Sequence, residues 1–336
     1  MSEHLDAHAD VFVPEFGGAE TETLSYSGDQ LRDAIRTHLD VQQISIAKLS
    51  TQAALGESTI SAWLNGTYRG NNNNVEMALR KWLQADALRQ RQQSVVPQAK
   101  KFISTPTARK YMTVLEYAQS MPDVGVIVGA AGTGKTSSIK HYRATYPNVW
   151  MLTASPEIGT ARAVTDALRD LLGVPKSGKY KMQSQIISKL DGTNGLLIVD
   201  EAQFLQPAAL DELRTLHDRA EIGLVFAGNE GVWRQLDGGI SRFSQLHSRV
   251  GARVNITRPT DTDIATILDA YDITDKKQRG LLAGVAKKPG ALRAMVKTLN
   301  LAFRVANGAG EQLNVEHIAA AYGQRSGGME TNHERA

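Results

Sequence analysis

The chain of 336 residues contains no cysteine. This absence excludes disulfide bonds, thiolate zinc sites and cysteine nucleophiles, and it fits a reducing compartment. Uninterrupted apolar runs of about 18 residues are also missing, as is the basic and apolar pattern of a signal peptide. We therefore expect a cytoplasmic protein without a membrane span. With 42% hydrophobic and 22% charged residues, the composition is that of a globular protein with two or three domains.

Positive charge is missing from the beginning of the chain. Residues 1–31 contain seven Asp or Glu and no Lys or Arg, although the whole chain carries a net charge of +3. Because they show no helical period, residues 1–28 predict a disordered acidic tail. The basic excess gathers in the Gln-rich stretch from Arg89 to Lys110. It predicts a basic linker over residues 86–105, which either passes close to phosphates or is merely solvated.

Helical spacing of apolar residues predicts an all-helical domain over residues 29–85. A helix from Ile46 is followed by a tight turn at Gly56 and by a second helix headed by Ser58, which is helix-turn-helix spacing. The second helix has few Arg or Lys, so strong sequence-specific readout of DNA is not supported. The domain binds either DNA or protein. Five polar residues would stay available to phosphates and base edges: Ser58, Thr59, Ser61, Asn65 and Tyr68.

Short apolar runs alternate with amphipathic helical segments over residues 106–258. This alternation predicts a parallel sheet with helices on both faces. After Pro259 the strand signal stops, so residues 259–322 predict a helical C-terminal subdomain, and residues 323–336 a flexible tail. The predicted strands cover residues 124–128, 149–153, 196–199, 224–227 and 253–256.

A phosphate-binding loop follows the first predicted strand and opens a helix. Its sequence GAAGTGKT matches the pattern G-x-x-x-x-G-K-[ST] at every fixed position. Backbone N–H groups of such a loop wrap phosphates, and the helix N-terminus adds positive charge. Lys135 would reach the β- and γ-phosphates of ATP, and Thr136 would ligate Mg²⁺. The candidate nucleotide ligands are Gly129, Ala130, Ala131, Gly132, Thr133, Gly134, Lys135 and Thr136.

Polar residues end the third and fourth predicted strands. Asp200 follows four apolar residues, so it lies at the carboxyl edge of the sheet, where it would hold Mg²⁺. Glu201 comes next and would orient the water that attacks the γ-phosphate. Asn229 emerges at the same edge and would contact the γ-phosphate or the water, or else it serves only as a turn residue after Gly228.

Several arginines are candidates to stabilise the negative charge that develops on the phosphoryl group in the transition state of ATP hydrolysis. Arg249 precedes the last predicted strand and can stabilise the phosphoryl group from a neighbouring subunit. Arg242 and Arg253 compete for this role. Arg293 opens a helix of the C-terminal subdomain and would report the nucleotide state to it. Each of them, taken singly, is nearly as readily a plain surface arginine.

The motifs together resemble a known family. After the phosphate loop, the order Asp200 with Glu201, Asn229, Arg249 and Arg293 is that of Walker B, sensor 1, arginine finger and sensor 2 in AAA+ ATPases. Combined with the helix-turn-helix, the chain resembles the Mu B family of phage transposition proteins from about residue 30 to 322. The similar segments are Thr59–Ser61, Arg80–Leu83, Asn148–Met151, Ile198–Gln203, Glu212–Arg214, Ile222–Val225 and Lys288–Arg293.

The resemblance implies an α/β fold: an AAA+ P-loop ATPase with a parallel sheet and a helical C-terminal lid, preceded by an all-α helix-turn-helix domain. It implies an ATP- and Mg²⁺-dependent ATPase that assembles on double-stranded DNA as oligomers or helical filaments, with little sequence preference. Such a protein delivers target DNA to a phage transposase in the host cytoplasm and stimulates strand transfer. The transposase in turn stimulates hydrolysis and release, which underlies target immunity.

Three features depart from the resemblance: the acidic extension, Ala130-Ala131 in the loop, and Gln203 after the acidic pair. Two other functions stay open. One is a nucleotide-sensing helix-turn-helix transcription regulator, and the other is a helicase loader of the insertion-sequence type.

Overall fold

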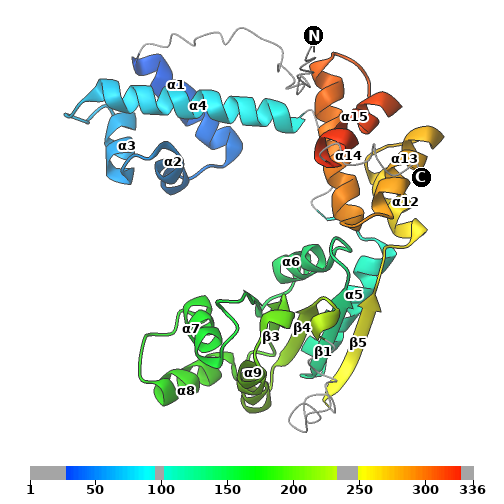
Figure 1. The fold of residues 1–336 in the computed structure, drawn as a ribbon. Helices are drawn as coiled ribbons and strands as arrows, with labels where there is room; N and C mark the ends of the chain where they lie inside the picture. Colours follow the sequence, from blue (N-terminus) through cyan, green and yellow to red (C-terminus); the bar gives the residue numbers. More distant parts are fainter. Residues whose placement is uncertain (1–27, 95–101, 233–248, 327–336) are drawn as a thin grey trace, which may run out of the picture. The chain divides into compact units, whose positions relative to one another are not determined.

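The computed structural model describes residues 28–94, 102–232 and 249–326. They belong to two compact units, one of residues 1–97 with 303–312, the other of residues 98–302 with 313–336 (Figure 1). The predicted acidic tail lies outside the described residues, except for Gly28. Among the helices that are described, none has both the length and the apolar character to cross a membrane.

Within the first unit, four helices of residues 28–94 pack around one apolar core (Figure 1). Ser45 begins the helix-turn-helix, because its Oγ accepts a hydrogen bond from the N–H of Lys48 (3.2 Å) and caps the second helix. Ala54, in the left-handed conformation, ends that helix, and Trp63 anchors the third in the core. The helices are α1 (Gly28–Gln42), α2 (Ile46–Ala53), α3 (Glu57–Leu64) and α4 (Asn72–Ser94).

The linker over residues 86–105 stays a prediction, but helix α4 continues to Ser94, past the end predicted for the helical domain at residue 85. The reason is Asp86, whose buried carboxylate accepts hydrogen bonds from His38 of α1 (2.8 Å), Arg89 (2.8 Å) and Gln90 (2.9 Å). Burial raises the pKa of Asp86, but the three hydrogen bonds outweigh burial and lower it. Asp86, a charged residue within the stretch predicted to be a linker, thus connects α4 to α1.

The second unit contains a five-stranded parallel sheet in the order β2-β3-β4-β1-β5. Because all neighbouring strands run in the same direction, their carboxyl ends meet at one edge, where ligands bind in open α/β sheets. This edge receives both the phosphate loop after β1 and the acidic pair at the end of β3. The strands are β1 (Val124–Gly129), β2 (Val149–Thr153), β3 (Leu196–Asp200), β4 (Gly223–Gly228) and β5 (Val250–Ile256).

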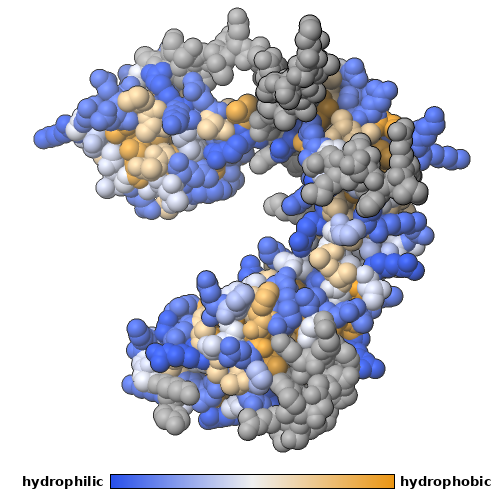
Figure 2. Space-filling model, viewed as in Figure 1, coloured by the Kyte–Doolittle hydropathy of each residue, from blue (hydrophilic) through white to orange (hydrophobic). Residues whose placement is uncertain are grey.

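Helices cover both faces of the sheet (Figure 1). On one face α5 (Pro106–Ser120) and α6 (Lys135–Thr145) bury aromatic and aliphatic side chains against the strands. On the other face lie α7 (Ala161–Leu172), α8 (Lys179–Leu190) and α9 (Pro207–Ala220). Burying one such large side chain contributes about 1.5–3 kcal/mol. The space-filling view accordingly displays mostly hydrophilic side chains on the helix surfaces, with apolar ones mainly between elements (Figure 2).

The C-terminal part of the second unit is helical, and Asp263 attaches it to α5. Asp263 is fully buried and accepts hydrogen bonds from the backbone N–H (2.8 Å) and hydroxyl (2.7 Å) of Thr107 at the start of α5. It also forms a capping box with Thr260. The helices are α12 (Asp261–Ala270), α13 (Lys276–Ala286), α14 (Ala291–Gly308) and α15 (Val315–Ser326), and the end of α14 from Phe303 on belongs to the first unit.

The parallel sheet, the helical C-terminal part and the preceding helical unit confirm the predicted fold class. The boundary at residue 258 stays a prediction, because the second compact unit includes residues on both sides of it. Helix α15 runs to Ser326, four residues into the segment expected to be a flexible tail from residue 323. The rest of that segment lies outside the described residues.

Candidate nucleotide-binding site

The phosphate loop between β1 and α6 is built on two left-handed glycines. Gly132 (φ 84°) and Gly134 (φ 98°) adopt a conformation that side chains disfavour. Gly132 also packs against the turn before α14, since a Cβ there would lie 2.0 Å from the carbonyl oxygen of Gly290. The loop therefore rests on the helical C-terminal part and leaves no room for a side chain at that contact.

Lys135 begins α6 and folds back into the loop. Its Nζ donates hydrogen bonds to the carbonyl oxygens of Gly129 (2.6 Å) and Ala130 (3.1 Å). Burial lowers the pKa of Lys135, the carboxylates of Glu201 and Asp200 oppose this, and the charge of Arg293 adds to the lowering. The predicted phosphate cation, both predicted carboxylates and one predicted arginine are thus close enough to act on one another.

Thr136 and Asp200 form the next contact of the site. The hydroxyl of Thr136 donates a hydrogen bond to Oδ2 of Asp200 (2.7 Å), and the other carboxylate oxygen accepts the backbone N–H of Glu201 (3.0 Å). One hydroxyl and one carboxylate are the small donor set that Mg²⁺ uses when nucleotide phosphates complete its shell. The described residues hold no group of three or more His, Asp or Glu suited to a metal ion. The hydroxyl of Thr136 and the carboxylate of Asp200 fit Mg²⁺ bound together with a nucleotide.

A cavity of about 580 Å³ lies beside the loop. Its polar lining includes Lys135, Thr136, Glu201, Asn229 and Arg293, all predicted from the sequence. The structure thus brings these five residues together. Sequence reasoning missed the apolar wall, because its members come from three separate segments whose apolar residues look like ordinary core. The wall includes Phe102, Ile103, Ile267, Tyr271, Leu292 and Val296.

Two further residues support the site from behind. The hydroxyl of buried Tyr111 on α5 donates to Oγ1 of Thr133 (3.0 Å), which in turn donates to the carbonyl of Ala130 (2.9 Å). Burial raises the pKa of Tyr111 to about 12, the hydrogen bond with Thr133 opposes this, and the charge of Asp263 adds to it. Phe102 stacks on the ring of His141 with centroids 4.0 Å apart. In sequence both aromatic residues resemble core residues, so no signal marked them.

Asn229 has two roles in the structure. Its Oδ1 accepts a hydrogen bond from the backbone N–H of Gly231 (2.8 Å), so the side chain shapes the turn after β4. The residue also lines the cavity. The side-chain oxygen thus serves the turn, and contact of Asn229 with the γ-phosphate or the attacking water stays a prediction.

Arg249 lies away from the cavity of its own chain. The start of β5 pairs with the start of β1 at Val124, and its end pairs with Gly129 beside the loop. Arg249 precedes β5, so it lies at the opposite edge, on the order of 20 Å from the loop at about 3.3 Å per residue. Its guanidinium pairs with Asp218 of α9 (3.1 Å). Arg253 is exposed midway along β5, and Arg242 lies outside the described residues.

Comparisons with known proteins match both parts of the second unit. Residues 119–236 match an AAA domain, and residues 248–324 match the C-terminal domain of the Mu B transposition protein. The ATP-dependent target DNA activator B of Escherichia phage Mu is 32% identical over 296 residues, which cover 87% of this chain and 94% of that protein. The chain belongs to the Mu B family.

Other similar proteins agree with this membership. The Mu-like prophage FluMu DNA transposition protein B of Haemophilus influenzae is 33% identical over 274 residues, covering 80% of this Mu B family chain and 94% of that protein. Among solved structures, the Aeropyrum pernix ORC2 protein aligns with a TM-score of 0.50 at 17% identity, covering 68% of this chain and 71% of that one. This likeness concerns the fold alone. The predicted family and the AAA+ ATPase class are confirmed.

Five polar residues of the helix-turn-helix differ in accessibility. Ser58 and Asn65 are exposed, whereas Thr59 and Ser61 are half-buried. Tyr68 packs against the core of the first unit, and its hydroxyl would lie 2.4 Å from a Cβ at Gly70. Tyr68 is half-buried, like Thr59 and Ser61. Their DNA contacts stay predictions.

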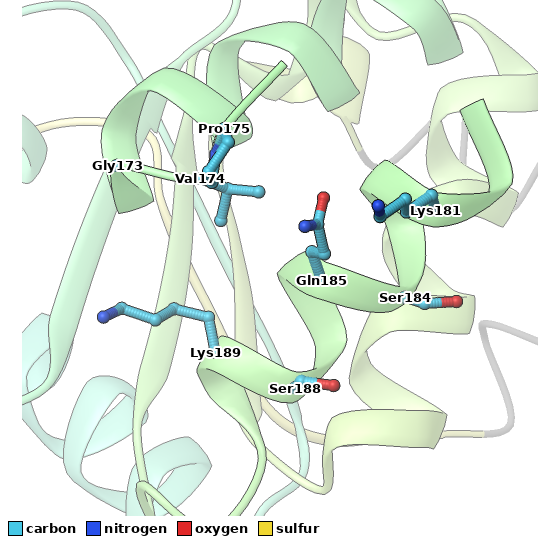
Figure 3. Close-up of a pocket in the computed structure, with 8 residues that line it drawn as sticks. All are labelled: Gly173, Val174, Pro175, Lys181, Ser184, Gln185, Ser188 and Lys189. Carbon is cyan, nitrogen blue, oxygen red and sulfur yellow. The ribbon is translucent and has the colours of Figure 1, made fainter. Parts of the chain in front are cut away.

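A second hollow, of about 430 Å³, lies between the end of α7 and α8 (Figure 3). On α8, Gln185 lies between Lys181 and Lys189 and faces the loop at Val174 and Pro175 (Figure 3). From residue 172 to residue 190 this Mu B family chain has four lysines and no Asp or Glu. Sequence reasoning missed this surface, although the run of lysines without acidic residues was a readable signal.

Proposed function

We propose that this protein is a Mg²⁺-dependent ATPase that binds DNA with little sequence preference, delivers target DNA to a phage transposase and stimulates strand transfer. The observation that carries the proposal is the contact of Thr136 with Asp200 beside Lys135 and Glu201 in one cavity. Relatives that share about a third of its sequence bear the name ATP-dependent target DNA activator B.

The polar residues of the site have distinct parts in the proposed hydrolysis. Lys135 exchanges the loop carbonyls for the β- and γ-phosphate oxygens when ATP enters. Thr136 and Asp200 would hold Mg²⁺, which neutralises charge on the phosphates. Glu201 orients the attacking water, and Asn229 contacts the γ-phosphate or that water. The apolar wall receives the base, and its neighbour Arg293 carries the nucleotide state to the helical C-terminal part.

Arg249 would act on a neighbouring protomer. Because it lies at the sheet edge opposite its own phosphate loop, its charge reaches a γ-phosphate only when protomers assemble head to tail. Hydrolysis would then depend on oligomers or filaments formed on DNA. ATP occupancy would hold the protein on DNA, and hydrolysis stimulated by the transposase would release it.

Titrations with unrelated DNA duplexes test this function. We expect similar affinities for all duplexes in ATP and Mg²⁺, and much weaker binding in ADP or with Lys135→Ala. The measurement is fluorescence anisotropy at one fixed salt concentration. Strong preference for one duplex would instead support the transcription regulator. Loading of a helicase, without stimulation of strand transfer by the transposase, would support the helicase loader.

The hollow between α7 and α8 supports a contact with the DNA backbone. Lys176, Lys181 and Lys189 are exposed, and none forms an ion pair with any described residue. Ser184 and Gln185 line the hollow and add hydrogen-bonding groups without negative charge. Such a surface fits phosphates of any sequence.

The same titration tests this contact. The double substitution Lys181→Glu and Lys189→Glu should weaken binding to every duplex and reduce the salt slope by about 0.9 for each lost phosphate contact. Lys140→Glu on α6 makes the same change of charge per residue on the other face of the sheet and serves as control. Unchanged affinity of the double variant, with ATP binding intact, would rule out this surface.

A further inference from the structure

Gln203 joins the ends of two strands at the candidate site. It lies in the 3-10 turn η1 (Ala202–Phe204) that follows β3. Its Nε2 donates a hydrogen bond to Oε2 of Glu201 (2.6 Å), and its Oε1 accepts one from the backbone N–H of Asn229 (3.3 Å). Glu201 and Asn229 line the nucleotide cavity. The side-chain amide of Gln203 thus contacts two residues that line the cavity.

Two glycines, the last residue of β4 and one shortly after it, lie against this side chain. A Cβ at Gly228 would lie 2.2 Å from Oε1 of Gln203, and one at Gly231 would lie 3.1 Å from its Cβ. Neither glycine has a positive φ, so backbone conformation does not require glycine at these positions. Neighbouring side chains leave little room for a Cβ there: Gln203 and Val232 lie against Gly228, and Asn229 and Gln203 lie against Gly231. The end of β4 therefore packs closely against Gln203.

Glu201 needs such support. Its backbone is left-handed (φ 55°, ψ 35°), a conformation that side-chain-bearing residues keep only where their surroundings hold it. The backbone N–H is held by Asp200 (3.0 Å), but this bond leaves the carboxylate free to rotate about its side-chain bonds. The hydrogen bond from Gln203 removes that freedom and leaves the other carboxylate oxygen for a water molecule.

We propose that Gln203 is a positioning residue for ATP hydrolysis. It holds the Glu201 carboxylate in the orientation that aligns the attacking water, and it couples this orientation to the turn at Asn229. The inference rests on the proposed function, because it requires Glu201 to be the water-orienting group.

Two substitutions separate positioning from space filling. Gln203→Ala removes both hydrogen bonds, and we expect kcat for ATP hydrolysis to fall by about 10- to 100-fold, since small misplacements of a catalytic group have effects of that size. ATP affinity should change by less than about 3-fold, because no phosphate contact is lost. Gln203→Glu keeps the shape but places a second carboxylate beside Glu201. It should lower kcat at least as much as Gln203→Ala, whereas a space-filling role predicts activity near wild type.

Gln206→Ala is the matched control. Gln206 is an exposed glutamine three residues further on, and its side chain makes no cap hydrogen bond to α9. Its kcat should equal that of the wild type. In the Glu201→Gln background, Gln203→Ala should add little further loss, because positioning acts through Glu201.

The outcomes distinguish this inference from the proposed function. If Glu201→Gln leaves hydrolysis unchanged, the water-orienting assignment in the proposed function fails. If Glu201→Gln slows hydrolysis but Gln203→Ala keeps the wild-type kcat, only the role of Gln203 is refuted. Fully additive losses in the double variant would also refute it.

Discussion

At the scale of single residues, space and backbone geometry decide which side chains the site tolerates. Gly132 is left-handed and abuts the carbonyl of Gly290, whereas Gly192, after α8, is left-handed in open space. The glycines and the lysine of the phosphate loop can be recognised in the sequence, because the left-handed turn that needs glycine involves only neighbouring residues. The partner of Gly132 is 158 residues away along the chain (290 − 132) and is visible only in the fold.

Gly132→Ala should abolish most ATP binding. The new Cβ would overlap the Gly290 carbonyl, so the loop or the helical part must move, and the left-handed backbone adds roughly 1–2 kcal/mol of strain. We expect an increase in the ATP dissociation constant of at least about 10-fold, which corresponds to about 1.4 kcal/mol. The measurement is a titration with a fluorescent ATP analogue. Gly192→Ala carries comparable strain without overlap and should lose stability but bind ATP normally. Normal binding by Gly132→Ala would contradict the contact.

At the scale of elements, buried polar contacts account for features of the helices that the sequence did not predict. The long helix α4 extends past its expected end because Asp86 is bound by His38 of α1. In the second unit, Asp263 attaches α12 to α5 through Thr107. Helix and strand periods were readable, since each depends on neighbouring residues. Carboxylates that bind partners far along the chain were not, because a charged residue in sequence usually indicates a solvated surface.

Asp263→Asn should destabilise the second unit by about 2–3 kcal/mol at pH 7, because the donors of Thr107 and Thr260 lose a charged acceptor. Burial raises the pKa of Asp263, but these hydrogen bonds outweigh it and lower the pKa. The stabilisation is therefore complete above the unfolded pKa near 3.9 and is lost as pH falls through the lower folded pKa.

Urea unfolding of the full chain at several pH values measures this effect. The difference between wild type and Asp263→Asn should be largest at neutral pH and should shrink below about pH 4. Asp261→Asn, an exposed carboxylate in the first turn of the same helix, is the control and should change little. A difference that grows with falling pH would contradict the linkage.

At the scale of the whole molecule, one protomer has an incomplete set of catalytic groups. Lys135, Thr136, Asp200 and Glu201 meet at the carboxyl edge of the sheet, while Arg249 lies at the other edge. The separation follows from the parallel arrangement, because the start and the end of a strand are at opposite edges. Assembly of protomers is the arrangement that would unite them.

Mixing two inactive variants tests assembly. Arg249→Ala keeps its own Glu201, and Glu201→Gln keeps its own Arg249, so a mixed interface contains one complete site. We expect each variant alone to lose about 10³-fold or more in kcat, as for an arginine finger, and the mixture to recover measurable hydrolysis on DNA. Arg253→Ala is the control, and this variant by itself should hydrolyse ATP on DNA at nearly the wild-type rate. No recovery in mixtures shown to co-assemble by crosslinking would refute action in trans.

The sequence by itself determined the phosphate loop, the acidic pair, the alternation of strands and helices, and the family resemblance. These depend on residues close together in the chain, so local pattern suffices. Only the tertiary structure decided which distant residues complete the site: Tyr111 behind the loop, the apolar wall of the cavity, Gly290 against Gly132, and Gln203 against Glu201 and Asn229. It also decided that Arg249 lies away from its own loop. Such contacts join residues that are far apart in the sequence. They depend on how helices and strands pack in space, and the spacing of residues in a single sequence does not show that packing.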